Sequence, residues 1–447
     1  MRKFKAGLQT LMEHRQISTG VSPLTAFLLS TAMRVGPGNI IGVTGAIAAG
    51  GPGALFWMWI SAFFGMATAY TEATLAQIFK EKRGDTFVGG LPFYARRLCG
   101  NKAWVGVLLS GMYIFYALMC LPAQGLNVIT SAGAIAEMVT GLHFELQSTF
   151  YYVGSVVVLV LVAFMAFGGI KRIGKWADRL VPVMAVIYIL TVLLLIVTNL
   201  NSVPYFFGAV FEGAFTPEAI FGGFFGTALL QGVKRGLMSN EAGQGTITMA
   251  AAAADAKHPC EQGIISALGV FLDTHVICTM TEFIIVMAHQ WGVNPEAWKA
   301  AKTYPKFLLS MNAMAPEMLQ TLVLILVSIC FCLFAYTCVI GFVSFSEISA
   351  NRISSNQAFI NFIRILCIFV AAFGISCNIA GYDLSNLWAF SDLANIIMVY
   401  ANVPMIYLGF KYVLRATNHY CQKDNSGFNS KVVGIEVEYW DKKSSEK

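Results

Sequence analysis

Two long apolar stretches of this 447-residue chain are interrupted by glycine-rich polar sequence where a membrane helix would otherwise continue. The interruptions lie at residues 34–39 (RVGPGN) and 231–236 (QGVKRG), and the second continues into residues 239–243 (SNEAG). Unpaired backbone amides and carbonyls are costly in hydrocarbon, so irregular backbone is tolerated only where it meets protein, an ion, a solute or a water-filled cavity. The pair of interruptions therefore predicts a binding site within the membrane.

Composition places the rest of the chain in the bilayer as well. Hydrophobic residues make up 57% of the sequence and charged residues only 12%, with a mean hydropathy of +0.65. A soluble domain of this length is far less apolar. We predict an all-α integral membrane protein with about ten transmembrane helices, each near the roughly 20 apolar residues that a bilayer requires. The predicted spans are residues 23–51, 54–79, 103–130, 150–167, 180–200, 218–254, 263–288, 319–344, 359–376 and 387–412.

The placement of Lys and Arg predicts the orientation of these spans. With the N-terminus inside, 24 of the 30 Lys and Arg residues fall on the cytoplasmic side, whereas the external loops hold only Lys299, Lys302 and Lys306. Cytoplasmic segments collect such residues, so we expect a multi-pass protein of the cell membrane with both termini in the cytoplasm. The basic residues form no cluster with interleaved aromatics, so we expect no nucleic-acid partner. The chain turns polar after Arg415, which predicts a tail with little structure.

The interrupted helices are the first and the sixth of the ten predicted spans, so each opens a block of five. An odd number of crossings inverts the second block, which gives the inverted repeat of many secondary transporters, with binding near the bilayer midplane. The predicted organisation is a cytoplasmic N-terminal segment (1–22), a first repeat (23–200), an external linker (201–217), a second repeat (218–412) and a cytoplasmic tail (413–447).

Several other functions lack their sequence signals. The ten Cys lie mostly inside apolar segments, without CxxC pairs or His at ligand spacing, so neither a zinc site nor a disulfide framework is indicated. No HExxH, GxSxG or P-loop pattern occurs, and we do not expect an enzyme. An ion channel would need a filter motif or a ring of charges, and neither is visible. Among the acids within the spans, we expect Glu72 and Asp273 to be structural partners of the interruptions.

Four sequence runs together resemble the alanine/glycine:cation symporter family, also described as sodium:alanine symporters. They are residues 34–43 (RVGPGNIIGV), 50–59 (GGPGALFWMW), 72–76 (EATLA) and 236–243 (GLMSNEAG), and the resemblance covers nearly the whole chain. It implies the leucine-transporter fold and Na+-driven import of a small neutral amino acid: alanine or glycine, with serine and glutamine as the alternatives.

A proton-coupled symporter of the same fold is the alternative. Some relatives of this fold replace a sodium ion with a lysine from the fifth span, and residues 180–200 contain no lysine. The oligomeric state is left open by the sequence.

The first interruption is expected to form the centre of the site. Gly36 and Gly38 flank Pro37, so carbonyls and amides become free; carbonyls suit sodium, and amides at a helix N-terminus suit a carboxylate. By resemblance, the side-chain oxygen of Asn39 binds sodium beside the substrate. The alternative is that Asn39 caps its half-helix.

A second sodium site is implied by the same resemblance. It would use the carbonyls of Ala32 and Val35 with Thr337, and Cys338 stands where the family pattern has a second hydroxyl. A thiol is a poor ligand for a hard cation, and Thr337 could instead bond its own helix backbone.

The remaining expected substrate contacts come from the third and sixth spans. Gln124 matches a glutamine of the family and would face the substrate, with helix packing as the alternative. Gly232 and Gly236 would expose backbone to the substrate, and Asn240 would begin the continuing half-helix beside it.

Overall fold

The computed structural model describes residues 4–13, 19–216, 226–381, 385–422 and 427–445. These residues are almost entirely helical, apart from one hairpin of two antiparallel strands in which Glu81 pairs with Val88. The elements of the first half are α1 (Phe4–Met12), α2 (Pro23–Arg34), η1 (Gly38–Gly42), α3 (Val43–Gly50), α4 (Ala54–Ile78), β1 (Glu81–Arg83), β2 (Thr86–Val88), α5 (Leu91–Leu98), α6 (Ala103–Thr140), α7 (Thr149–Ala166), α8 (Gly169–Thr198), η2 (Leu200–Ser202) and α9 (Val203–Phe215).

The second half continues the helical architecture. Its elements are α11 (Thr227–Asn240), α12 (Thr248–Ala253), α13 (Pro259–Val270), η3 (Phe271–Cys278), α14 (Thr279–Ala288), α15 (Gln290–Val293), α16 (Pro295–Ala300), α17 (Thr303–Met314), η4 (Glu317–Leu319), α18 (Gln320–Ile353), α19 (Gln357–Ile379), α20 (Ser385–Gln422), α21 (Ser430–Val433) and α22 (Glu438–Ser445). The predicted start of the sixth span, Glu218, lies outside the described residues.

Within the described residues, eight helices are long and apolar enough to cross a membrane. They are Ala54–Ile78, Ala103–Thr140, Thr149–Ala166, Gly169–Thr198, Pro259–Val293, Glu317–Ile353, Gln357–Ile379 and Ala389–Gln422. Two further segments are interrupted: α2 is followed by η1 and α3, and α11 is followed by α12. The all-α membrane class with discontinuous helices is thus confirmed, whereas the count of ten spans and the inverted repeat stay predictions.

Large apolar side chains cover the outer surface of the long helices. Val156 of α7, Leu190 of α8, Phe369 of α19 and Tyr407 of α20 are all more than half exposed. A soluble protein rarely exposes apolar side chains on this scale, so this surface suits contact with lipid.

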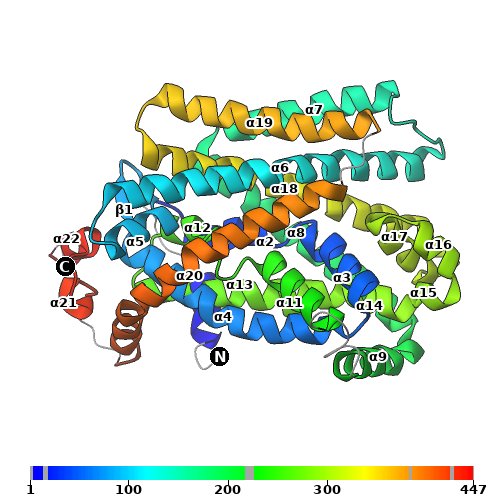
Figure 1. Cartoon of the computed structure of the whole chain (residues 1–447), viewed down its shortest axis with the longest axis horizontal. Helices are drawn as coiled ribbons and strands as arrows, with labels where there is room; N and C mark the ends of the chain where they lie inside the picture. The colour runs from blue at the N-terminus through cyan, green and yellow to red at the C-terminus, as the bar shows by residue number, and fades with distance from the viewer. Residues whose placement is uncertain (1–3, 14–18, 217–225, 382–384, 423–426, 446–447) are drawn as a thin grey trace.

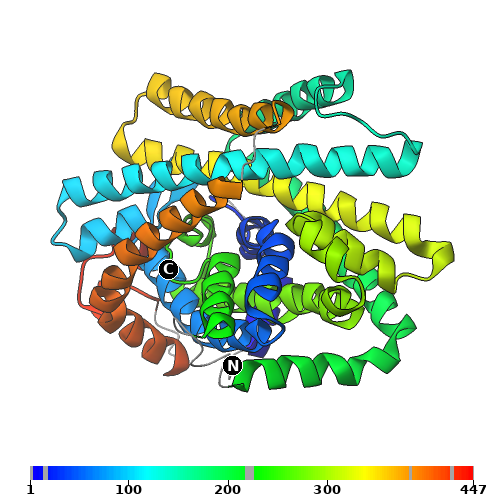
Figure 2. The ribbon, with the colours of Figure 1, turned by 45° about the vertical axis from the view of Figure 1, so that its right-hand side comes forward.

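The long helices form two groups that pack against each other (Figures 1 and 2). In one group α6 packs along α18 and α19, and α7 lies beside α19. In the other, α4 packs against α11 and α13, and α2 and α3 complete the group. Both interrupted segments belong to this second group, which therefore holds irregular backbone away from lipid.

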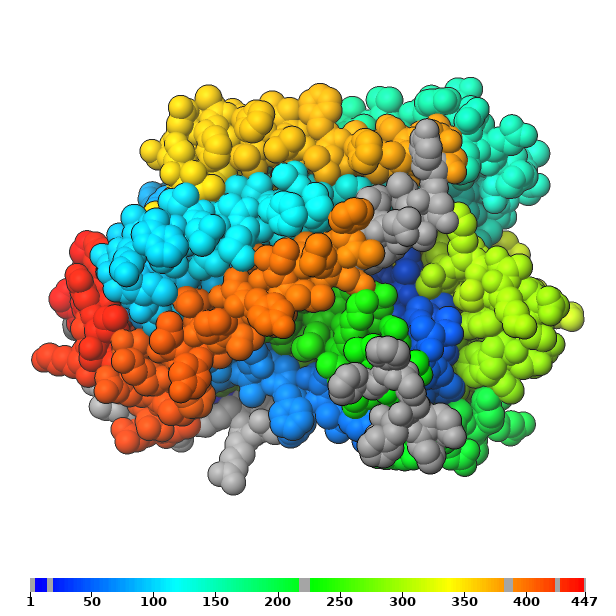
Figure 3. Space-filling view, viewed as in Figure 1, coloured from blue at the N-terminus to red at the C-terminus, as the bar shows by residue number. Residues whose placement is uncertain are grey.

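Helix α20 crosses one face of the molecule diagonally, and the C-terminal residues lie at its far end (Figure 3). It packs against α6 of the first group and against α4 and α13 of the second. This crossing helix therefore spans the junction between the two groups.

The C-terminal tail is structured, contrary to the expectation from its polarity. It contains α21 and α22, and Phe428, Val437 and Trp440 are buried. These apolar residues are sparse in a polar segment, but each finds a partner surface in the folded protein. Burying these side chains stabilises the tail and offsets the conformational entropy that is lost when it becomes ordered. The overall polarity of the segment does not reveal this gain.

Candidate functional site

The first interruption follows directly from proline and glycine chemistry. Helix α2 ends at Arg34, and Pro37 has no amide hydrogen with which to continue the helical pattern. The next amides bond within a new turn, with Asn39 N donating to Gly36 O at 3.1 Å and Ile41 N to Pro37 O at 2.8 Å. Carbonyls at the end of α2 are thereby released from their helical partners.

Asn39 is the first predicted site residue that the structure places in a network. Its Oδ1 accepts a hydrogen bond from Gly36 N at 2.8 Å, and its Nδ2 donates to Asp273 Oδ1 at 2.6 Å. Asp273 Oδ2 also accepts from Ser239 Oγ and from Thr274 Oγ1, both at 2.9 Å. Asn39 thus closes the turn onto Gly36 and also joins the two interruptions through Asp273, while its sodium-binding and capping roles both stay predictions.

Asp273 and Thr274 lie on η3, a π-helical stretch between α13 and α14. Such wide turns are rare and often occur at functional sites, because the extra residue per turn redirects side chains. The first interruption also continues as a π-helical turn, η1. Two widened helical segments therefore face each other across the Asn39–Asp273 hydrogen bond.

Arg34 joins the same region from the end of α2. Its Nε donates to Asn240 O at 3.1 Å and its Nη2 to Ser266 Oγ at 2.8 Å, while the residue is only 2% exposed. An added Cβ at Gly269 would lie 2.1 Å from Arg34 Nη1, so a glycine is needed for this buried guanidinium to fit.

The second interruption spans residues 241–247 and is filled by a carboxylate. Glu72 of α4 accepts hydrogen bonds from Gly243 N at 3.3 Å and from Gly245 N at 3.1 Å, and from Asn402 Nδ2 at 2.7 Å. Gly243 and Gly245 both have positive φ, at 86° and 75°, which glycine adopts without strain. The expected partnership of Glu72 and Asp273 with the interruptions agrees with these contacts.

The first part of the predicted interruption, residues 231–236, is wrong, because α11 continues unbroken through them to Asn240, whereas the predicted continuation over residues 239–243 overlaps the observed gap. Gly232 and Gly236 instead allow α11 to approach α4 closely. An added Cβ would lie 2.3 Å from Ala54 O at Gly232 and 2.4 Å from Ser61 Oγ at Gly236. These glycines serve helix packing, so they do not present open backbone to a substrate.

Asn240 is fully buried at the end of α11, and it does not line the cavity beside the first interruption that is described below. Its Oδ1 accepts from Ala242 N at 3.0 Å, and its Nδ2 donates to Thr274 Oγ1 at 3.2 Å. The side chain therefore holds the second interruption against η3.

A cavity of about 40 Å³ lies beside the first interruption. Three predicted substrate contacts, Gly36, Gly38 and Gln124, line it, and so does Cys338. About 10–15 Å³ by this measure holds one water molecule, so the cavity suits a molecule of a few non-hydrogen atoms. The other lining residues are Met33, Arg34, Pro37, Tyr116, Cys120, Met238, Ser239, Glu241, Phe342, Ser391 and Asn395.

Two acceptor oxygens of this cavity have no partner within the described part of the chain. They are Gln124 Oε1 on α6 and Asn395 Oδ1 on α20, and both are buried. Buried polar atoms are normally hydrogen-bonded, so these two oxygens indicate a donor that the cavity receives.

A narrower cavity of about 10 Å³ lies between α2, α8 and α18. It brings together Ala32 and Thr337 from the predicted second sodium site, and Ser344 also lines it. Thr337 Oγ1 donates to Phe334 O at 3.0 Å, which is the backbone bond that the sequence left as an alternative. Its oxygen still has lone-pair capacity to bind a cation.

Cys338 and Val35 lie against the same turn. Cys338 Sγ lies 3.6 Å from both Ala32 O and Met33 O, so the thiol occupies the position beside the released carbonyls. Val35 follows α2 directly, and its amide donates to Thr31 O at 2.8 Å. The cation-binding roles of these residues stay predictions.

An ion-pair cluster connects α11 to α20 on the side of the second interruption that points away from the C-terminal tail. Asp392 accepts from Lys234 at 2.6 Å and from Arg235 at 3.3 Å. Its side chain is 13% exposed, so the cluster is only partly solvated.

Sequence reasoning named Asp273 only as a structural partner and missed Ser239, Thr274, Ser391 and Asn395 as site residues. Ser391 and Asn395 are four residues apart, hence on one helix face, inside the apolar span 387–412. This polar pair was a usable signal. Ser239 and Thr274 gave none, because their role depends on the neighbouring element.

The charges around the two interruptions do not balance. Arg34 interacts electrostatically with Glu72, Glu241 and Asp273, and all four residues are buried. If the three acids are ionised, this cluster carries two negative charges more than its one cation neutralises. Buried charge of this kind requires compensation by a proton or a cation.

Comparison with known proteins places this geometry in a family context. Residues 1–434 match the profile of the Sodium:alanine symporter family. A putative sodium/proton-dependent alanine carrier protein, YrbD of Bacillus subtilis (strain 168), is 34% identical over 99% of this chain and 90% of its own length. A probable sodium/glutamine symporter of the same organism, GlnT, is 35% identical over 91% of this chain and 80% of its own.

One solved structure shares the fold. The crystal structure of MhsT in complex with L-phenylalanine superposes with a TM-score of 0.64 at 13% sequence identity. The match covers 91% of this chain and 93% of that one. This likeness supports the expected leucine-transporter fold.

Proposed function

Because the chain belongs to the sodium:alanine symporter family, we propose that it imports a small neutral amino acid in symport with sodium. Membership of the family makes the protein an amino-acid symporter and not an enzyme. What we propose is the identity of the coupling ion and of the amino acid that it carries. The main observation in support is that three buried acids, Glu72, Glu241 and Asp273, surround a single buried cation, Arg34, at the two interruptions. An entering cation neutralises this surplus, which couples its binding to the closed arrangement of the site.

Sodium is favoured over a proton by the oxygen atoms around Asp273. The hydroxyls of Ser239 and Thr274 and the amide of Asn39 converge on its carboxylate. Hard cations prefer such oxygen ligands. Rotation of the two hydroxyl hydrogens exposes oxygen lone pairs of Ser239 and Thr274 to an ion beside the Asp273 carboxylate, while Asn39 Oδ1 stays bonded to Gly36 N.

The cavity beside the first interruption supports a small zwitterion as substrate. Gly38 begins the helical stretch that continues through α3, and amides at a helix N-terminus suit a carboxylate. The partnerless oxygens of Gln124 and Asn395 suit an ammonium group. A volume of about 40 Å³ favours glycine or alanine over serine, and serine over glutamine.

Uptake of radiolabelled amino acids into proteoliposomes tests this proposal. We expect alanine or glycine uptake with sodium outside and little with lithium or choline. Asp273→Asn keeps the shape of the side chain but removes one charge. The uptake rate that sodium stimulates should therefore fall at least tenfold, as expected when one partner of a buried charged contact is removed. Asp85→Asn is the matched control, because it makes the same substitution at a side chain that is 87% exposed and lies outside this network.

The proton-coupled alternative gives a different pattern in the same assay. An inward proton gradient would then drive uptake without sodium, and the buried carboxylates would act as proton acceptors. Uptake that ignores sodium and proton gradients alike would contradict both mechanisms.

We further propose that both termini face the cytoplasm, as the distribution of Lys and Arg predicts. Cys421, near the end of α20, is exposed and suits labelling by a membrane-impermeant thiol reagent. It should react in inside-out vesicles and stay unmodified in intact cells, with Cys421→Ser as the control for background.

A further inference from the structure

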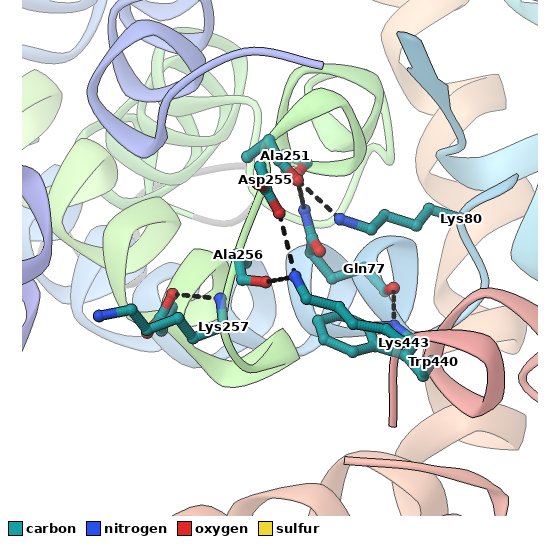
Figure 4. Close-up of polar contacts among 10 residues, drawn as sticks. Gln77, Lys80, Ala251, Asp255, Ala256, Lys257, Trp440 and Lys443 are labelled. Carbon is teal, nitrogen blue, oxygen red and sulfur yellow. Dashed lines mark hydrogen bonds and ion pairs between the residues drawn. The ribbon is translucent and has the colours of Figure 1, made fainter. Parts of the chain in front are cut away.

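The C-terminal tail docks on the end of α4 through a buried tryptophan. Trp440 of α22 is 1% exposed, and its Nε1 donates to Gln77 O at 2.8 Å (Figure 4). The side chain of Gln77 in turn donates to Ala251 O and, at 3.1 Å, to Ala254 O. One residue of α4 therefore connects the tail to the end of α12, the tail-side half of the second interrupted helix.

A lysine of the tail binds the segment that follows α12. Lys443 Nζ donates to Asp255 Oδ1 at 3.1 Å and to Ala256 O at 3.0 Å (Figure 4). The same segment pairs with the start of α2, because Val21 N donates to Ala253 O at 3.1 Å and Asp255 N donates to Val21 O at 2.9 Å. The tail thus binds the segment through which the end of α12 pairs with the start of α2.

The tail also completes the surroundings of a buried lysine. Lys80 Nζ donates to Ala254 O at 2.7 Å and lies 4.0 Å from the ring centroid of Phe87, 4.7 Å from that of Tyr439 and 5.2 Å from that of Trp440. No ion pair within the described ranges involves Lys80. Aromatic faces stabilise such a cation, and the tail supplies two of the three rings.

The tail is a small folded unit rather than a loose strand. Asp441 accepts from Ser430 N at 2.7 Å and from Val437 N at 3.4 Å, and Arg415 Nη1 of α20 donates to Val433 O at 2.6 Å. A cavity of about 740 Å³, open to solvent, lies between the β1–β2 hairpin and α22. Lys443 reaches the segment after α12 from one edge of the tail, so this contact can be released without unfolding the tail.

We propose that residues 427–445 form a latch that keeps the tail-side half of the binding cavity closed. Docked, the latch holds α12 and the start of α2 against α4. Released, it lets these ends separate and opens a path from the cavity toward the tail side. The inference rests on the proposed function, because alternating access requires that this side opens in each transport cycle.

A reversible cross-link in the full chain tests the latch. Lys443→Cys and Asp255→Cys, in a Cys421→Ser background, are joined by a bifunctional maleimide whose spacer contains a cleavable disulfide. We expect uptake in proteoliposomes to fall at least tenfold when the latch is joined and to recover when the spacer is reduced, as for a gate held shut. The control joins Lys442→Cys to Glu438→Cys, an exposed pair within α22 itself. Equal uptake by the joined latch and the joined control overturns the proposal.

Hydrogen–deuterium exchange provides a second measurement that needs no transport. Lys443→Met should speed exchange of the amides in residues 248–257, by up to about fivefold for one partly buried ion pair. Lys442→Met, which removes the neighbouring exposed lysine, should leave these amides unchanged. Equal exchange in the two variants contradicts the latch. If no form of the protein takes up amino acids, the proposed function fails, and exchange still decides the latch.

Discussion

The two interruptions solve the same physical problem in different ways. In the first, Pro37 and the glycines around it release the backbone, and Asn39 folds back to satisfy Gly36 N while a cavity remains beside it. In the second, the side chain of Glu72 enters the gap and accepts from Gly243 N and Gly245 N. The first interruption is thus open to a ligand, and the second is filled by the protein. Irregular backbone in a membrane marks a binding site only where no side chain has already satisfied it.

The largest expected effect comes from a glycine that lies outside both interruptions. Gly232→Ala would place a Cβ 2.3 Å from the carbonyl oxygen of Ala54, and backbone atoms cannot move aside as a flexible side chain can. We expect a loss of about 3 kcal/mol in the free energy of unfolding, or failure to fold. Thermal unfolding followed by size-exclusion chromatography measures this loss. Gly45→Ala on α3 is the control, since an added Cβ there meets nothing within 4 Å.

An isosteric substitution tests whether the Glu72 carboxylate satisfies the backbone amides of the second interruption. Glu72→Gln retains the shape, but its amide group can face Gly243 N or Gly245 N with a donor instead of an acceptor. An unsatisfied buried amide costs about 2 kcal/mol, so the melting temperature should fall clearly. Glu317→Gln, an exposed site on η4, should leave the melting temperature unchanged. An unaltered melting temperature in Glu72→Gln would mean that the second gap does not depend on this carboxylate.

A substitution at the first interruption should change the affinity for the amino acid and leave the stability of the fold unchanged. At Gly38 an added Cβ meets nothing within 4 Å, and Gly38 lines the cavity. Gly38→Ala should therefore keep the melting temperature but weaken amino-acid binding about tenfold, as one misplaced methyl group does in a small pocket. Equilibrium binding of labelled alanine and glycine checks this, and alanine should lose more than glycine. Unchanged affinities would remove Gly38 from the binding surface.

The smallest effect is expected at Cys338. A hydroxyl is a better ligand for a hard cation than a thiol, so Cys338→Ser should lower the sodium concentration for half-maximal uptake by about threefold. Cys330→Ser is the matched control on α18, because Cys330 Sγ faces Met184 O instead of the end of α2. The second sodium site would lose its support if both variants behaved like the unmodified protein.

The sequence predicted the first interruption well because proline and glycine act there through local backbone chemistry. Pro37 removes a donor wherever it stands, and the break follows from that alone. The class of fold was equally accessible, since apolar length and charge distribution are properties of the chain by itself.

The start of the second interruption was predicted too early because glycine has two uses in a membrane helix. Gly232 permits close packing against α4, whereas Gly243 permits positive φ, and the sequence around each is similarly polar. Only the neighbouring helix distinguishes them. The folded structure of the tail was not predicted for a related reason. The hydrogen bond that fixes Trp440 is accepted by the carbonyl of Gln77, which lies far away in the sequence.

The cluster of Asp392 with Lys234 and Arg235 makes one side of the site sensitive to electrolyte, whereas the tail side combines an ion pair, Lys443 with Asp255, with backbone pairing that is insensitive. Dissolved ions weaken the attraction between partly solvated charges, and the Debye length is about 8 Å at physiological ionic strength. A backbone hydrogen bond such as the one from Val21 N to Ala253 O is little affected by salt. Raising the concentration of an inert salt should therefore ease both the separation of α11 from α20 and the release of Lys443 from Asp255, while the backbone pairing on the tail side stays intact. The tail side would then keep part of its closure at salt concentrations that loosen the other side.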